Sequence, residues 1–232
     1  MNNTSYLFAS CKPWHKSRFE ALQADGDSIW QWVSTPEELI DAAKALEPRY
    51  IFFFHWNWLV PSDIYSRYEC VCFHMTDVPY GRGGSPLQNL IKAGHNSTKL
   101  TALRMVKEMD AGPVYAKRDM SLDGKAEDIY LRAGELSTDI AKWMIKTQPD
   151  PLPQSGDVTL FKRRKPEQSE LPTEGTLTSI YDHIRMLDAP TYPYAFIEHG
   201  SLRLTFHDAT IVDGELYAKV KITLPTLKRN DP

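Results

Sequence analysis

The chain has 232 residues, of which 42% are hydrophobic and 25% charged, so it can bury the core of one sizeable domain with a small appendage. A net charge of −3, with equal numbers of basic and acidic side chains over residues 160–232, argues against a protein whose main partner is a polyanion. Composition therefore predicts a folded globular protein with no nucleic-acid partner.

The three cysteines, Cys11, Cys70 and Cys72, are an odd number, and no cluster of His and Cys completes a zinc site. Three reduced thiols favour a reducing compartment. The first residues lack a basic stretch followed by an apolar run, and no segment reaches the roughly 20 apolar residues of a membrane span. We expect a cytoplasmic protein without a metal and without a membrane partner.

Short apolar segments alternate with amphipathic ones in the first part of the chain. The alternation predicts strands over 5–9, 28–33 and 50–56, with helices over 14–23 and from Ser34–Glu38 to Pro48 between them. Strands separated by helices form parallel sheets that bind ligands beyond their carboxyl ends. No GxGxxG follows the first strand, so a dinucleotide-binding fold of the usual kind is not supported.

A histidine and an aspartate mark the central segment as the candidate site. The strand from Glu69 ends on His74, and the turn Met109–Gly112 presents Asp110. Such a pair can share and orient a proton, although most histidines near strand ends are structural. Asn57 closes the preceding strand and should reach the same edge of the sheet as His74; a turn-forming role for Asn57 is the alternative.

The string HMTDVPYGRGGSP, from His74 to Pro86, resembles the HxSLLPxYRGxxP segment of the folate-dependent formyltransferases, and the MDAG turn at Asp110 resembles their LDTG turn. The resemblance implies an α/β, Rossmann-like, doubly wound and mostly parallel sheet with His74 and Asp110 as catalytic residues. The family's catalytic asparagine corresponds to Cys72 here. A thiol cannot supply the amide N–H that polarises a carbonyl. Activity is therefore lost, or Asn57 has taken over.

The same resemblance implies formyl transfer from N10-formyltetrahydrofolate, without a metal. The loop after the strand at 50–56 would receive the pterin ring, and a second loop would close over the folate. The expected folate-binding residues are Trp58, Leu59, Val60, Val106 and Lys107.

In the second half, helices are expected over 86–93, 127–147 and 177–186, with a strand over 100–105. The Pro-rich segment 149–156 predicts a boundary between a catalytic domain, 1–150, and a small C-terminal subdomain, 151–232. Short β-prone runs over 197–224 predict an antiparallel sheet there. Histidines 55, 95, 183, 199 and 207 are scattered singly and are assigned structural roles.

The short C-terminal module, the FKRRKPE run and the lack of a basic tRNA-facing domain favour an amino sugar on a nucleotide as the acceptor. FKRRKPE, from Phe161, and the IRML and YPYAF segments resemble sugar-nucleotide formyltransferases. The TDVPYGRGGSPLQ loop, in which the family asparagine is replaced, looks closest to the formyltransferases of the pseudaminic acid type, which implies a UDP-4-amino-4,6-dideoxy sugar as acceptor and allows a homodimer. A carrier-bound or tRNA-bound aminoacyl group, or a non-catalytic folate-binding protein, stay as alternatives. The residues expected to bind the acceptor are Met75, Thr76, Arg82, Arg163, Lys165 and Arg185.

Overall fold

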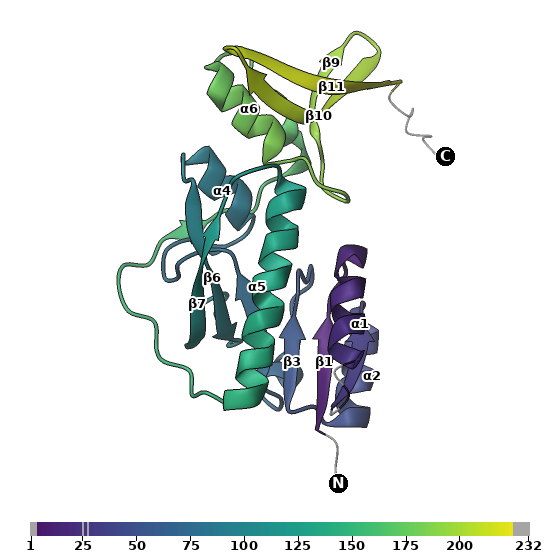
Figure 1. Ribbon diagram of the computed structural model, residues 1–232, viewed down its shortest axis with the longest axis vertical. Coiled ribbons are helices and arrows are strands. Elements are labelled where there is room, and N and C mark those ends of the chain that lie inside the picture. The colour runs from purple at the N-terminus through teal and green to yellow at the C-terminus, as the bar shows by residue number, and fades with distance from the viewer. Residues whose placement is uncertain (1–3, 25, 27, 225–232) are drawn as a thin grey trace, which may run out of the picture.

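The computed structural model describes residues 4–24, 26 and 28–224. Its first domain is built on a six-stranded sheet of order β2-β1-β3-β4-β6-β7 (Figure 1). Strands β1 to β4 run parallel, and β6 and β7 are added antiparallel at one edge. The mostly parallel sheet expected from the sequence is confirmed. The strands are β1 (Ser5–Ala9), β2 (Ile29–Val33), β3 (Tyr50–Phe53), β4 (Cys70–His74), β6 (Ser97–Arg104) and β7 (Val114–Ser121).

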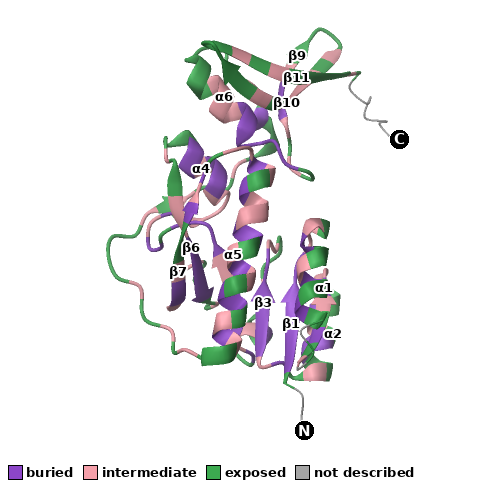
Figure 2. Ribbon diagram, viewed as in Figure 1, coloured by how far each residue is buried: buried purple, intermediate pink, exposed green. Residues whose placement is uncertain are grey.

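Helices cover both faces of this sheet. The core on one face takes side chains from α1, α4 and α5, and the core on the other face takes side chains from α2 and α3. Because the middle strands are covered on both sides, their residues are almost fully buried, as the purple β1 and β3 in Figure 2 show. The helices are α1 (Lys16–Ala24), α2 (Pro36–Leu46), α3 (Ser62–Tyr65), α4 (Pro86–Lys92) and α5 (Ala126–Thr147).

The start of α2 is determined by its own sequence. Thr35 is the N-cap, and its hydroxyl accepts a hydrogen bond of 3.2 Å from the backbone N–H of Glu38. Pro36 occupies the first turn, where its missing N–H costs nothing. The predicted helix start is confirmed.

Two elements differ from the prediction. Strand β3 ends at Phe53 rather than near residue 56, because His55 adopts a left-handed backbone conformation with φ 55° that cannot continue a strand. Strand β7 was not predicted, and its exposed residues Arg118 and Asp119 interrupt the apolar pattern that would have indicated it. Because β3 ends at Phe53, Asn57 lies in the loop that follows it, and because β7 follows β6, Asp110 lies in the turn between these two strands.

The segment after α5 returns along the first domain before the C-terminal subdomain begins. Leu152 pairs with Val114, and the short strand β8 (Leu160–Phe161) pairs in parallel with β5 (Arg82–Gly83). These contacts place residues 152–161 beside the loop that follows His74. The loop after the predicted catalytic strand is thus supported by a segment about 80 residues away in sequence.

The C-terminal subdomain lies at the far end of the molecule from the N-terminus (Figure 1). It consists of a 3-10 turn (Pro166–Ser169), α6 (Leu177–Arg185) and an antiparallel sheet of β9 (Ala195–His199), β10 (Leu202–Val212) and β11 (Glu215–Thr223). The antiparallel sheet predicted for this region is confirmed. Of the helices in the described part of the chain, none combines the length and apolar character needed to cross a membrane.

Candidate active site

The structure brings His74 and Asp110 together. His74 is the last residue of β4 and is 8% exposed, and Asp110 lies in the turn between β6 and β7. Nδ1 of His74 is 3.6 Å from Oδ2 of Asp110. The same carboxylate oxygen accepts a hydrogen bond of 2.8 Å from the backbone N–H of Gly83. The structure therefore places the His74 ring and the Asp110 carboxylate next to each other, as the sequence predicts.

The hydrogen bond on the far side of the His74 ring defines its tautomer. Nε2 of His74 lies 2.8 Å from the carbonyl oxygen of Gly81. A carbonyl only accepts, so Nε2 carries a hydrogen. In the neutral ring, Nδ1 is then the basic nitrogen, and it faces the Asp110 carboxylate.

Close contacts constrain the backbone conformation of the turn that carries Asp110. Asp110 has φ 54°, and a Cβ added at Gly112 would lie 1.7 Å from the carbonyl oxygen of Arg104. The side-chain amide of Gln154 donates hydrogen bonds of 2.8 Å to the carbonyl oxygens of both Asp110 and Gly112. Gln154 was missed by the sequence analysis, since it lies in the Pro-rich segment and carries no motif of its own.

Cys72 occupies the position of the asparagine in the motif. Burial raises the pKa of its thiol well above the ordinary value, and the nearby Asp110 carboxylate raises it further. The side chain is therefore a neutral thiol rather than a thiolate nucleophile. A neutral thiol also cannot replace an amide as a strong donor.

Asn57 follows β3 at the carboxyl edge of the sheet. Phe53, at the end of β3, pairs with Cys72, which is two residues before His74, so the loop carrying Asn57 leaves the sheet beside the histidine strand. Asn57 is exposed, and among the described residues its side chain makes no hydrogen bond. Its amide is free to bind a ligand.

A partly buried cluster of side chains supports the turn that carries Asn57. The thiol of Cys11 donates to the carbonyl oxygen of His55 over 2.9 Å, and the backbone N–H of Asn57 faces the same sulfur. Nε2 of His15 lies 2.8 Å from Nδ1 of His55. Burial lowers the pKa of His15 to about 2 and that of His55 to about 4. Cys11 and His15 were not singled out from the sequence because only the fold brings them to this turn.

The two loops expected to bind folate are open to solvent. Trp58 is 45% exposed, Leu59 82% and Val106 36%. Partly buried side chains of both loops, from Val60 and Met105, pack against the same core cluster. The five predicted folate-binding residues, over 58–60 and 106–107, make no backbone hydrogen bonds through their N–H groups within the described chain. Exposed apolar side chains beside unpaired main-chain donors fit a flat, hydrogen-bonding pterin ring.

The residues expected to bind the acceptor do not form one site. Met75 and Thr76 are 5% and 0% exposed, and both contribute to the interior rather than to a surface. The guanidinium of Arg82 donates to the side-chain oxygen of Gln154. Arg185 is 7% exposed and pairs with Asp182, so its role here is structural. The two expected residues that are exposed are Arg163 and Lys165.

The chain is similar to known formyltransferases in sequence and in fold. The solved structure titled methionyl-tRNA formyltransferase from Clostridium thermocellum is 40% identical, covers 95% of this chain and 99% of that chain, and superposes with a TM-score of 0.92. A family model described as the C-terminal domain of methionyl-tRNA formyltransferase matches residues 166–223. The chain belongs to the formyltransferase family.

Curated relatives carry the same name at lower identity. Methionyl-tRNA formyltransferase from Sulfurihydrogenibium sp. (strain YO3AOP1) is 24% identical over 80% of this chain and 62% of its own length. The protein of that name from Bacillus mycoides (strain KBAB4) is 29% identical over 66% of this chain and 51% of its own length. The chain thus spans between about half and two thirds of the length of these relatives.

The comparisons overturn the expected sugar-nucleotide acceptor. Two solved structures match at low identity: a likely sugar N-formyltransferase from Mycobacterium tuberculosis at 17% (TM-score 0.68) and a 4-N formyltransferase from Francisella tularensis at 13% (TM-score 0.66). Such matches show the shared fold alone, whereas the 40% match is to a protein named for methionyl-tRNA. The prediction of no nucleic-acid partner was also wrong, because the 40% identical structure is titled for methionyl-tRNA.

Proposed function

We propose that the protein transfers a formyl group from N10-formyltetrahydrofolate to the α-amine of methionyl-tRNA, in the cytoplasm. The placement of His74 against Asp110 at the carboxyl edge of the sheet carries the chemical part of this proposal. The acceptor is supported by the names of the relatives and by the family match over residues 166–223.

The first requirement of formyl transfer is a group that takes a proton from the attacking amine. Nδ1 of His74 serves this role, because the carbonyl of Gly81 fixes the hydrogen on Nε2. The 3.6 Å between Nδ1 and the Asp110 carboxylate exceeds a hydrogen-bond length, so Nδ1 is not already engaged. Once protonated, the ring becomes a cation beside a carboxylate, which lowers the energy of the charged state.

The second requirement is a donor for the negative charge that develops on the formyl oxygen. Asn57 has an exposed side-chain amide without a partner in the described chain and lies in the loop next to the histidine strand. The cluster of Cys11, His15 and His55 holds the backbone of that loop. A donor on a supported loop needs little reorganisation when the charge appears.

The third requirement is a place for the folate. When bound, N10-formyltetrahydrofolate supplies the electrophilic formyl carbon and the nitrogen that leaves with a proton. Trp58, Leu59 and Val60 on one loop and Val106 and Lys107 on the other would hold its ring through apolar contact and main-chain hydrogen bonds. A group of at least three His, Cys, Asp or Glu side chains suited to a metal does not occur among the described residues.

The direct test is a reaction of the purified protein with N10-formyltetrahydrofolate and methionyl-tRNA, followed by mass spectrometry of the released amino acid. We expect N-formylmethionine with the wild type, and at least a 100-fold slower rate with His74→Ala and Asp110→Asn. Folate binding, measured by calorimetry, is the control that these variants remain folded. Folate binding without formylation of methionyl-tRNA by the wild type would refute the proposed acceptor.

A further inference from the structure

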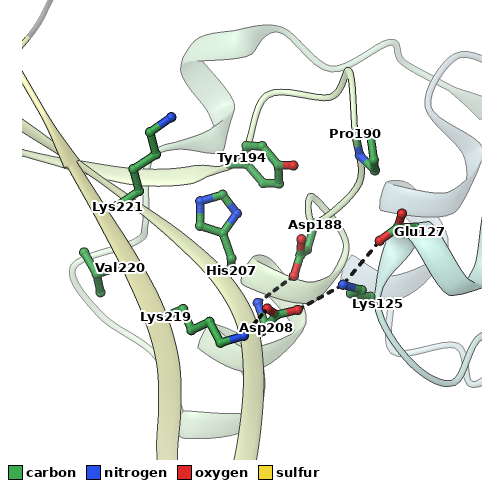
Figure 3. Close-up of a pocket in the computed structure, with 10 residues that line it drawn as sticks. All are labelled: Lys125, Glu127, Asp188, Pro190, Tyr194, His207, Asp208, Lys219, Val220 and Lys221. Carbon is green, nitrogen blue, oxygen red and sulfur yellow. Dashed lines mark hydrogen bonds and ion pairs between the residues drawn. The ribbon is translucent and has the colours of Figure 1, made fainter.

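The segment that connects the first domain to the C-terminal subdomain is held at both ends. At its start, Leu152 exchanges two backbone hydrogen bonds with Val114 of β7, at 2.7 and 2.8 Å. Beyond its end, the C-terminal subdomain is tied to the start of α5, where the Asp208 carboxylate forms an ion pair of 2.9 Å with Lys125 (Figure 3). The stretch between these anchors, residues 153–165, therefore follows a defined path along the first domain.

The connecting segment runs beside the loop that follows His74. The backbone N–H of Thr159 donates to the carbonyl oxygen of Pro79 at 3.2 Å, and the carbonyl oxygen of Thr159 accepts from the backbone N–H of Arg82 at 3.0 Å. Strand β8 then pairs in parallel with β5. Backbone hydrogen bonds thus hold one side of the histidine loop against this segment.

Gln154, in the same segment, connects the histidine loop to the turn that carries Asp110. Its side-chain NH₂ group donates hydrogen bonds of 2.8 Å to the carbonyl oxygens of Asp110 and Gly112. Its side-chain oxygen accepts hydrogen bonds from Nε and Nη2 of Arg82, at 3.1 and 2.8 Å. A primary amide has two donor hydrogens and an oxygen with two lone pairs, so all four positions are used. The orientation of the amide is fixed, because carbonyls only accept and a guanidinium only donates.

The histidine loop also binds the Asp110 side chain directly. The backbone N–H of Gly83, the residue after Arg82, donates a hydrogen bond of 2.8 Å to Oδ2 of Asp110. This oxygen is the one that lies 3.6 Å from Nδ1 of His74. Asp110 has φ 54°, a left-handed conformation that costs energy for a residue with a Cβ. The loop therefore holds the carboxylate, while Gln154 holds the strained backbone of the same residue.

We propose that Gln154 is a positioning residue for formyl transfer, which fixes the Asp110 carboxylate opposite His74 without touching either substrate. The assignment rests on the proposed function, because it gives Asp110 a part in that reaction. Arg82, which the sequence analysis expected to bind the acceptor, orients the Gln154 amide in this arrangement. The reacting centre is thus completed by a residue of the connecting segment, outside the predicted catalytic domain 1–150.

Two substitutions separate the hydrogen bonds of Gln154 from its packing. Methionine has a similar length but no hydrogen to donate, and glutamate keeps the contact with Arg82 but loses both donors to the turn. We expect Gln154→Met and Gln154→Glu each to lower kcat about 30-fold. The Kd of N10-formyltetrahydrofolate should change less than about 3-fold, because a separate bond, from the N–H of Met105 to the carbonyl of Cys70, anchors the folate loop. Gln23→Met, at an exposed position of α1, is the matched control and should change neither quantity.

A double-mutant cycle tests whether Gln154 acts through Asp110. In an Asp110→Asn background, where the carboxylate is already lost, Gln154→Met should lower kcat by less than about 3-fold more. A purely structural role would give effects that multiply. Multiplied effects, or a kcat for Gln154→Met equal to that of Gln23→Met, would overturn the proposal.

The NMR signals of the His74 ring give a readout that needs no acceptor. In protein labelled with ¹⁵N in the histidine rings, the His74 signals are assigned by their loss in His74→Gln. Gln154→Met should move them toward their positions in Asp110→Asn, and Gln23→Met should leave them in place. Unchanged His74 signals in Gln154→Met would overturn the positioning role and leave the proposed function standing. Failure of the wild type to formylate methionyl-tRNA would instead refute the proposed function, so the two failures are observed separately.

Discussion

Nδ1 of His74 faces Oδ2 of Asp110 across 3.6 Å, while the opposite nitrogen of the same ring is held by the carbonyl of Gly81. One strand end supplies the histidine, and a turn about 35 residues later supplies the carboxylate. Because each side of the ring has a different partner, the two nitrogens have different roles.

His74→Gln should lower kcat by about 100-fold or more, because glutamine keeps a hydrogen-bonding side chain but has no basic nitrogen. The measurement is single-turnover formylation with saturating folate. His95→Gln is the matched control, since His95 is hydrogen-bonded to Tyr80 and lies outside the proposed site. Equal rates for both variants would contradict the role of His74 as the base.

Asn57→Ala should lower kcat by about 100-fold, as for the loss of one donor to a developing oxyanion. Asn96→Ala, which removes another exposed amide after α4, should leave the rate unchanged. If Asn57→Ala retains full activity, the asparagine serves only the turn and another group polarises the formyl oxygen.

Gly112→Ala should abolish activity and lower stability. The new Cβ would lie 1.7 Å from the carbonyl oxygen of Arg104, so the backbone of the turn must move and Asp110 must move with it. Thermal unfolding and formylation are measured together. Gly94→Ala is the control, because no atom lies within 4 Å of its added Cβ; its φ of 82° adds a backbone cost that Gly112 does not carry, so a smaller loss there is the more decisive. If Gly112→Ala loses no more activity and no more thermal stability than Gly94→Ala, the turn that carries Asp110 tolerates the added Cβ.

Gly134→Ala should destabilise the protein by about 1–3 kcal/mol, although alanine is normally the better helix residue. Gly134 lies within α5, and its added Cβ would be 2.7 Å from Cε1 of His15 and 3.1 Å from Nε of Arg18. Denaturant unfolding measures the change. Asp139→Ala, on an exposed position of the same helix, is the control. A stabilising effect at position 134 would show that α1 can move away from α5.

Stability should fall as the pH decreases from 7 toward 4. The pKa values of His15 and His55 are lowered to about 2 and about 4 by burial, whereas an unfolded histidine has a pKa near 6.5. The unfolded chain therefore binds protons first as the pH falls, and each histidine costs about 2 kcal/mol between pH 7 and pH 5. Unfolding free energies at several pH values test this.

His15→Gln supplies the comparison for that pH series. His15→Gln removes one of the two histidines whose pKa is lowered by burial. The decrease in unfolding free energy between pH 7 and pH 5 should therefore be about half as large, even if stability at pH 7 is lower. The same slope in wild type and variant would show that other groups cause the acid sensitivity.

The local sequence was sufficient to predict those helices and strands whose determining residues lie close together in the chain. Thr35 and Pro36 determine the start of α2, and the apolar run at β3 predicts a strand covered on both faces. The closeness of His74 and Asp110 was expected from the family motif, and their catalytic roles stay a prediction. In each case the pattern reflects a physical requirement of the residues themselves, such as a capped helix end or a buried strand.

Tertiary structure decided the rest. The sequence suggested that Met75 and Thr76 could bind the acceptor, but the packing of β6 against β4 places them in the interior. Gln154 supports the Asp110 turn only because the segment after α5 folds back on the first domain. The composition of the chain predicts no nucleic-acid partner, whereas the 40% identical solved structure is titled methionyl-tRNA formyltransferase; a net charge is an average over the whole surface and does not report on a single binding site. Contacts between residues far apart in sequence leave no local pattern, and only the folded chain specifies them.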